Sequence, residues 1–336
     1  MEQKREKPAV GADGPYNLNR SHSIVLAPEN QSKIVTLKAF LAHPWPPREL
    51  ILEPWLATQS LNMIYSWRGV GKTHVALGIA YAVASGGEFL GWKADKPRGV
   101  LYLDGEMPGN ALHERLHALT QGAPDFPEEN FRLLTPDLQK GFMPDLATFK
   151  GQQEIDRFIL PSTELIIVDN LSCLLRGDGR ENEAESWISC GQWALAKRAQ
   201  GKSIIFIHHA GKNGNQRGTS KREDILDTVM VLKRPSDYEA SDGARFEVHF
   251  EKARHLYGEN VEPFVASLTQ EGSTQSWKML PLVESNRIKV IDLYREGLSI
   301  KDIVEELEVD RSTVYRILNK AESEGEIRPL RGRRRG

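Results

Sequence analysis

A short stretch that combines small residues, a lysine and a hydroxyl side chain has the composition of a phosphate-binding loop. It reads Ser-Trp-Arg-Gly-Val-Gly-Lys-Thr from Ser66 to Thr73, with serine where the usual pattern G-x-x-x-x-G-K-[ST] begins with glycine. Backbone N–H groups of such a loop wrap a polyphosphate, and the N-terminus of the following helix adds partial positive charge. We expect the Lys72 ammonium to reach the β- and γ-phosphates of ATP and the Thr73 hydroxyl to ligate Mg²⁺. The candidate nucleotide-binding residues are Ser66, Trp67, Arg68, Gly69, Val70, Gly71, Lys72, Thr73 and His74.

Two carboxylates that follow apolar segments complete this chemistry. Leu165–Val168 is apolar and Asp169 follows directly, which is the pattern of a Walker B strand that supplies a second Mg²⁺ ligand. Asn170 stands where an adjacent acid would otherwise orient the attacking water. The predicted strand Gly99–Leu103 leads to Glu106, and we expect that carboxylate to face the γ-phosphate as a general base. The alternative interpretation of Glu106 is an acid at the start of a helix.

Short apolar strands alternate with helices from residue 49 to about residue 210. The strands are continuous apolar runs, so both of their faces should be covered, as in a mainly parallel sheet flanked by helices. The expected strands are Leu61–Tyr65, Gly99–Leu103, Phe131–Leu134, Leu165–Val168 and Ser203–Ile207, and the expected helices are Lys72–Ala84, Asn110–Leu119, Gln152–Ile159 and Glu183–Gln200. Further strands separated by turns predict an antiparallel extension of the sheet, at Asp227–Leu232, Phe246–Phe250, Pro263–Ser267 and Gln275–Met279.

Composition along the chain divides it into regions. Residues 1–48 are expected to form a flexible arm, with a short helix over Ile34–Leu41 that ends before a proline cluster. Residues 49–281 should form the α/β domain, and residues 286–327 a small all-α domain. Residues 328–336 form a basic tail with five arginines and no acid, although the net charge of the whole chain is −2.

The composition also excludes several classes of protein. Hydrophobic residues make up 40% and charged residues 27% of the chain, which excludes wholesale disorder and a fibrous repeat. No apolar run approaches the roughly 18–20 residues of a membrane span, and the charged N-terminus lacks the apolar core of a secretory signal. Cys173 and Cys190 lack metal-ligand spacing, and we interpret them as reduced thiols of a cytoplasmic protein.

Over about residues 50–270 the chain resembles the RecA-type ATPase core, and within it the RepA-type hexameric replicative DNA helicases of plasmids. The resemblance rests on the phosphate loop and Walker B aspartate together with Glu106, the pair His208-His209 and the element Arg217-Gly218-Thr219. The opening serine of the phosphate loop, the longer N-terminal arm and the added C-terminal region depart from that family. The resemblance implies a RecA-like P-loop fold and hydrolysis of ATP with Mg²⁺. It also implies a ring of identical subunits, with a hexamer favoured, that unwinds or translocates on DNA in replication of a plasmid or another mobile element.

The same resemblance implies roles for individual residues. His209 would contact the γ-phosphate, whereas His208 points the other way along its strand and is interpreted as structural. Lys252 and Arg254 match the K-x-R element of the DnaB-type helicases. Either Arg254 or Arg217 could reach the nucleotide of the next subunit, and we favour Arg254 as the finger, assisted by Lys252. The alternative for this pair is a solvated surface.

Two loops would face the central pore of such a ring, at residues 171–184 and 210–220. Each contains glycine and Lys or Arg, which suits contact with the backbone of single-stranded DNA, and neither contains an aromatic residue for stacking on bases. Lys212 and Arg217 are the candidate DNA contacts of the second loop. Exposed loops without a ligand are the alternative.

The C-terminal region has the pattern of a helix-turn-helix. A predicted helix over Arg287–Glu296 is followed by a second helix capped by Ser299 and a third that begins after Asp310. The third resembles the last helix of a resolvase-type helix-turn-helix, whose first residues enter the major groove of duplex DNA. Its exposed reading face would be Arg311, Ser312, Thr313, Tyr315 and Arg316. A protein-docking module is the alternative, because the middle helix is acidic.

Two other functions stay open on the sequence. One is a recombination ATPase similar to RecA and RadA, and the other is a DNA-bound regulator that uses ATP as a switch rather than as fuel for a motor. A recombinase would exchange strands, and a regulator would hydrolyse ATP slowly and bind duplex DNA specifically. A helicase would unwind a forked duplex.

Overall fold

The computed structural model describes residues 34–120, 128–177, 183–211, 223–271 and 274–328, and the chain divides into the units Met1–Pro47 and Arg48–Gly336. In its described residues the first unit contains α1 (Leu37–Ala42). The Thr36 hydroxyl caps this helix by accepting from the backbone N–H of Ala39 at 3.2 Å. The helix ends before the proline cluster, as predicted, and its side chains are exposed.

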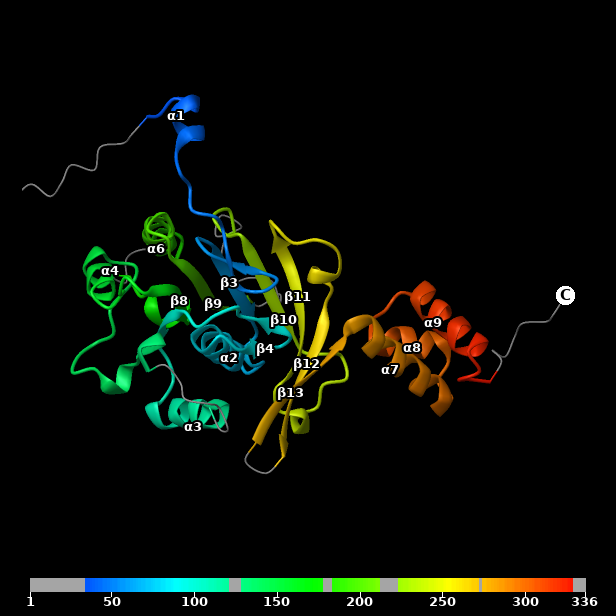
Figure 1. Cartoon of the computed structure of the whole chain (residues 1–336). Helices are drawn as coiled ribbons and strands as arrows, with labels where there is room; N and C mark the ends of the chain where they lie inside the picture. The colour runs from blue at the N-terminus through cyan, green and yellow to red at the C-terminus, as the bar shows by residue number, and fades with distance from the viewer. Residues whose placement is uncertain (1–33, 121–127, 178–182, 212–222, 272–273, 329–336) are drawn as a thin grey trace, which may run out of the picture. The chain divides into compact units, whose positions relative to one another are not determined.

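Among the described residues, nine strands form one sheet in the second unit, in the order β13-β12-β11-β10-β3-β9-β8-β6-β7 (Figure 1). The strands are β3 (Leu61–Ser66), β6 (Gly99–Asp104), β7 (Phe131–Leu134), β8 (Thr163–Asp169), β9 (Ser203–His209), β10 (Thr228–Lys233), β11 (Arg245–Ala253), β12 (Phe264–Glu271) and β13 (Thr274–Pro281). Each predicted strand overlaps an observed one. The strands from β10 to β7 in this order are parallel, and β11, β12 and β13 add antiparallel neighbours.

The antiparallel extension begins one strand later than the sequence predicted. β10 is parallel to β3, and the first antiparallel pair is β10 with β11. The reason is the long connection after β9, which returns the chain to the amino ends of the parallel strands. There the backbone N–H of Asp227 donates to the carbonyl of Leu61 at 2.7 Å.

Helices cover both faces of the parallel strands (Figure 1). One face packs against α2 (Lys72–Ser85) and α3 (Gly109–Thr120), and the other against α4 (Phe149–Asp156), α5 (Leu171–Leu174) and α6 (Glu183–Ala199). Alternate residues of one strand enter different cores: Ile205 and Ile207 pack with α2, whereas Ile204 and Phe206 pack with α6. This two-sided burial is the reason why the strands read as continuous apolar runs.

Two small hairpins were not predicted. They pair β1 (Leu50–Leu52) with β2 (Leu56–Ala57) and β4 (Glu88–Phe89) with β5 (Trp92–Lys93). These strands are too short to show a period in the sequence. Trp55 and Trp92 join the two hairpins by an edge contact with ring centroids 5.4 Å apart.

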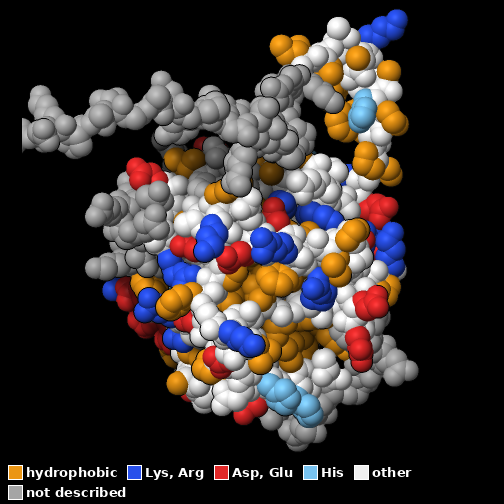
Figure 2. All heavy atoms as spheres, turned by 90° about the vertical axis from the view of Figure 1, so that its left-hand side faces the viewer, with side chains coloured by type: hydrophobic (Ala, Val, Ile, Leu, Met, Phe, Trp, Pro, Cys, Tyr) orange, Lys and Arg blue, Asp and Glu red, His pale blue; other side chains and the backbone are white. Residues whose placement is uncertain are grey.

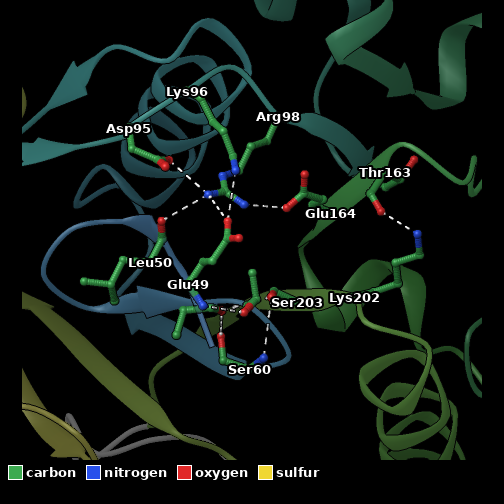
Figure 3. A network of polar contacts seen from close by, with 12 residues as sticks. Glu49, Leu50, Ser60, Asp95, Lys96, Arg98, Thr163, Glu164, Lys202 and Ser203 are labelled. Atoms are coloured by element: carbon green, nitrogen blue, oxygen red, sulfur yellow. Dashed lines mark hydrogen bonds and ion pairs between the residues drawn. The ribbon is translucent and has the colours of Figure 1, made fainter. Parts of the chain in front are cut away.

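Arg98 ties the first hairpin to the amino ends of the central strands. Figure 3 shows its guanidinium between Glu49, Asp95 and Glu164, with N–O distances of 2.8, 3.0 and 2.6 Å. The arginine side chain is 1% exposed, whereas all three carboxylates are partly exposed. Glu49 lies just before β1 and Glu164 lies in β8, so one buried cation joins segments distant in the sequence. This network lies at the end of the sheet opposite the phosphate loop.

The C-terminal helices α7 (Leu282–Glu296), α8 (Ile300–Leu307) and α9 (Arg311–Ser323) form a core of their own. α7 begins at Leu282, directly after β13, rather than at the predicted Arg287. Gly297 ends α7 with φ +96°, and Ser299 caps α8 in a reciprocal pair with Asp302. No helix in the described part of the chain has the length and apolar character needed to cross a membrane.

We expect Arg98→Met to lower the free energy of unfolding by about 1.5–3 kcal/mol, because hydrogen bonds to charged groups are lost around a buried position. Lys96→Met is the matched control: Lys96 pairs with the same Glu49 at 3.0 Å, but both partners are exposed, so the change should stay within about 1 kcal/mol. Urea denaturation measures both. Equal effects of the two substitutions would contradict a stabilising role for Arg98.

Candidate nucleotide-binding site

The phosphate loop connects the end of β3 to the start of α2. Gly69 and Gly71 have φ values of +74° and +127°, where any side chain would strain the backbone. A Cβ atom on Gly71 would also lie 3.0 Å from Cε1 of Phe246. Because Gly71 precedes the helix, no side chain is available there to cap the first N–H groups of α2. Those groups can therefore serve an anion.

Lys72 is held by oxygen atoms of the loop itself. Its Nζ donates to the carbonyl oxygens of Ser66 at 3.1 Å and Trp67 at 2.9 Å, and to the Ser66 hydroxyl at 3.2 Å. The serine that departs from the usual loop pattern therefore adds an acceptor that glycine lacks. Burial lowers the pKa of Lys72 from 10.5 to about 8, although the charges of Asp169 and Glu106 act in the opposite direction.

The other candidate residues of the loop differ in their surroundings. Trp67 and Arg68 are exposed, and Val70 is buried in the core beside α2. Burial, with a smaller contribution from the charge of Arg115, lowers the pKa of His74 to about 4, so its imidazole is neutral at physiological pH.

The two predicted Mg²⁺ ligands lie together. Asp169 ends β8 and is 4% exposed. Its carboxylate accepts a hydrogen bond from the Tyr102 hydroxyl at 2.6 Å and another from the Thr73 side chain. Burial raises the pKa of Asp169 to about 6, against the effect of these hydrogen bonds.

This pair of oxygen donors suits an ion that is completed by substrate. Mg²⁺ is commonly held by one or two protein oxygens together with phosphates and water. Among the described residues, no group of three or more His, Cys, Asp or Glu could hold a metal by itself. Thr73 and Asp169 therefore fit a cation that arrives with a nucleotide.

Glu106 reaches the same edge of the sheet from the connection after β6. β6 and β8 are parallel neighbours, with Asp104 opposite Asp169. The carboxylate of Glu106 accepts from the side-chain amide of Asn170, and its Oε2 lies 3.8 Å from Nε2 of His209. The Glu106 side chain is 57% exposed, so it can meet a bound molecule. His208 is buried, in keeping with the structural interpretation.

The sequence analysis missed Asp104, which holds the connection that carries Glu106. Its Oδ1 accepts from the backbone N–H groups of Glu106 at 3.3 Å and Met107 at 3.2 Å, and its Oδ2 accepts from the Thr135 hydroxyl at 3.0 Å. Burial raises the pKa of Asp104 despite these hydrogen bonds. Tyr102 was missed as well. A signal was present, because residues 102 and 104 fall on one side of a strand.

Lys252 and Arg254 lie at the opposite end of the sheet. Ala253 pairs with Thr228, the first residue of β10, far along the sheet from the phosphate loop. Arg254 donates from Nη2 to the Asp224 carbonyl at 2.7 Å, and Lys252 donates to the Glu223 carbonyl. Neither cation is placed to meet a nucleotide on its own chain.

Other candidates fall outside the described residues. These are Lys212, Arg217 and most of the second candidate pore loop, residues 178–182 of the first, and residues 329–336 of the basic tail.

The candidate reading face of α9 is largely exposed. Arg311, Ser312, Tyr315 and Arg316 are exposed and Thr313 is half-buried. The Arg311 guanidinium lies over the Tyr315 ring, 5.7 Å from its centroid. The opposite side of the helix packs into the three-helix core through Val314, Ile317 and Leu318.

A family profile described as an AAA domain matches residues 28–215, more than half of the 336-residue chain. The chain belongs to this family. Its core is a RecA-like α/β domain of the P-loop ATPase type, which implies nucleotide binding. A second profile, described as a helix-turn-helix domain, matches residues 286–336. The protein is therefore a P-loop ATPase with a C-terminal domain of a DNA-binding type.

Several solved structures are similar to the core. The KaiC-like protein PH0186 of Pyrococcus horikoshii is 14% identical, with 69% of this chain and 94% of that one covered and a TM-score of 0.47. The RadB recombinase is 17% identical, with coverage of 63% and 88% and a TM-score of 0.43. The ATPase domain of a third protein is 14% identical, with coverage of 65% and 84% and a TM-score of 0.45. Likenesses at this level do not indicate a shared activity.

The lowered pKa of Lys72 predicts a pH dependence of nucleotide binding. Above pH 8 the lysine is neutral and must take up a proton to pair with phosphates, so affinity for ATP should fall by up to about tenfold per pH unit. Isothermal titration calorimetry from pH 7 to pH 9.5 measures this. Lys72→Arg stays charged throughout and should show a flat profile. The same slope in both proteins would contradict the assignment.

Proposed function

We propose that the protein is an ATP-hydrolysing, ring-forming DNA helicase or translocase that serves replication of a plasmid or another mobile element. The observation that carries the proposal is the meeting of Lys72, Thr73, Asp169, Glu106 and His209 at one edge of the sheet, in a chain that also has a helix-turn-helix. These groups match, in type and position, what phosphoryl transfer to water requires.

Each group has a part in hydrolysis. Lys72 would neutralise the β- and γ-phosphates, and Glu106 would accept a proton from the attacking water. Thr73 and Asp169 would hold Mg²⁺, which when bound supplies positive charge against the developing negative charge of the phosphates. Asn170 and His209 contact Glu106 and would orient its carboxylate or report on the γ-phosphate.

The placement of Lys252 and Arg254 supports a shared site. Because they lie far from the phosphate loop of their own chain, a catalytic role is open to them only in a neighbouring subunit. α1 supports assembly from another direction. Leu37, Phe40 and Leu41 of this short helix are exposed, and apolar side chains of this kind are stabilised by a partner surface.

Duplex contacts are assigned to the C-terminal domain, and single-strand contacts to the loops that follow β8 and β9. On the face that Figure 2 shows, basic and acidic side chains stand side by side. The described residues of that face therefore do not form a continuous basic path for a DNA backbone. A DNA-bound regulator that uses ATP as a switch is the second candidate. It is favoured by contacts, described below, between the phosphate loop and the helical domain.

Glu106→Gln should keep ATP bound but lower the rate of hydrolysis by about 10²-fold or more, because the amide keeps the shape and loses the base. Unwinding of a forked duplex should stop as well. Glu114→Gln, on the exposed side of α3, is the matched control and should leave both rates unchanged. A malachite-green phosphate assay and a fluorescent unwinding assay measure the effects. Undiminished hydrolysis in Glu106→Gln would remove the assignment, and a wild-type ATPase that never unwinds would favour the switch.

Mixing inactive subunits tests the ring. Arg254→Ala subunits have an intact phosphate loop, and Lys72→Ala subunits have an intact finger, so mixed rings should recover part of the ATPase rate. Glu106→Gln mixed with Lys72→Ala is the control, because both changes damage sites that the other chain's finger cannot repair. Native mass spectrometry confirms that mixed assemblies form. No recovery in mixed assemblies would contradict a shared site.

A further inference from the structure

The loop between β10 and β11, residues 234–244, contacts the phosphate loop directly. Arg234, the first residue after β10, donates from Nη2 to the Gly69 carbonyl at 3.4 Å. Its guanidinium lies 4.4 Å from the centroid of the Tyr238 ring, and the Tyr238 hydroxyl donates to the Gly243 carbonyl at 3.1 Å. The arginine is thus anchored within its own loop while it touches the segment that would wrap a phosphate. Any movement of Gly69 on nucleotide binding reaches this loop.

Asp237 lies in the same loop between two cations. One carboxylate oxygen accepts from Arg245 of β11 at 2.8 Å, and the other accepts from Lys289 of α7 at 2.7 Å. Arg245 also pairs with Asp242 at 2.9 Å, which braces the loop against the start of β11. Partial burial raises the pKa of Asp237, but the hydrogen bonds from Lys289 and Arg245 lower it overall, so the carboxylate is charged at neutral pH.

Lys289 belongs to the first helix of the helix-turn-helix domain. Its side chain is 14% exposed, and the next residues, Val290 and Ile291, are buried in the three-helix core. Arg287, on the same helix, donates to the carboxylates of Glu324 at 2.9 Å and Glu326 at 2.6 Å, just past the end of α9. Polar contacts therefore extend from the phosphate loop through the β10–β11 loop and α7 to the candidate reading helix.

α7 is attached to the core at two separate points. The covalent connection from β13 is fixed by the backbone N–H of Leu282, which donates to the Pro263 carbonyl at 2.9 Å. The second point is the Lys289–Asp237 pair, roughly 10 Å further along the helix at 1.5 Å per residue. Two such points determine the direction of α7. A shift of the loop relative to β13 would turn the helix, and the packed helices α8 and α9 would turn with it.

We propose that the Asp237–Lys289 pair couples nucleotide binding at the phosphate loop to duplex DNA binding by the helix-turn-helix domain. The inference rests on the proposed binding of ATP and DNA and adds how each regulates the other. Coupling of this kind is reciprocal: the factor by which nucleotide changes the affinity for duplex equals the factor by which duplex changes the affinity for nucleotide. We expect a factor of at least about 5, within the usual range of about 5–150.

The experiment measures four dissociation constants by fluorescence anisotropy. The probes are a fluorescein-labelled mixed-sequence duplex, with and without a non-hydrolysable ATP analogue, and a fluorescent ATP analogue with Mg²⁺, with and without unlabelled duplex. Lys289→Met removes the charge and keeps an unbranched apolar side chain. It should reduce the coupling factor to within about twofold of one, while each ligand bound alone keeps its wild-type affinity.

Three further variants make the result specific. Asp237→Asn breaks the same pair from the other side and should also abolish coupling, which provides a second test if Lys289→Met does not fold. Lys289→Arg keeps the charge and should retain coupling. Lys301→Met is the matched control, because Lys301 pairs with Glu305 of its own helix at 3.6 Å on an exposed surface, and it should retain coupling too.

The outcomes separate this inference from the proposed function. If wild-type protein binds both probes without mutual effect, or if Lys289→Met and Asp237→Asn retain the full factor, the coupling inference is wrong and the proposed function stands. If the protein binds no nucleotide, or no duplex under any condition, the proposed function is wrong and the coupling is overturned with it.

Discussion

The buried carboxylate of Asp169 is the group on which the geometry of the nucleotide edge depends. A carboxylate that is 4% exposed is costly unless hydrogen bonds satisfy it, and here the Tyr102 hydroxyl and the Thr73 side chain do so. These partners come from β6 and α2, while Asp169 ends β8. The need to satisfy one buried charge therefore holds two strands and the phosphate loop in a single arrangement. The positions of Lys72 and Glu106 follow from that arrangement.

Parallel pairing explains why so many polar groups meet at this edge. Parallel strands end on the same side of a sheet, so the residues that follow β3, β6, β8 and β9 converge even though long segments separate them in the chain. The register adds finer control. It sets Asp104 opposite Asp169, and Asp104 in turn holds the backbone that carries Glu106. Buried groups thus fix the scaffold, and the more exposed Glu106 is left free to act on a substrate.

The two ends of the sheet have different tasks. The amino ends hold the Arg98 network and the Lys252 and Arg254 side chains, which suits stability and contact with a neighbour. The carboxyl ends hold the phosphate loop. The antiparallel strands link this end to the helical domain, because the β10–β11 loop touches Gly69 and β13 continues into α7. A domain attached in this way can respond to the nucleotide without contacting it.

The sequence by itself determined the features that depend on neighbouring residues. The phosphate loop, the strands, the helix-turn-helix and the fold class all follow from local spacing, and the fold was confirmed. The roles of Glu106, Arg254 and the reading face stay predictions. Only the tertiary structure showed that Tyr102 satisfies Asp169, that Arg98 joins three carboxylates, and that Lys289 meets Asp237. The physical reason is that each of these contacts joins residues far apart in the chain, and their pairing depends on strand order and register, which no local pattern of residue types encodes.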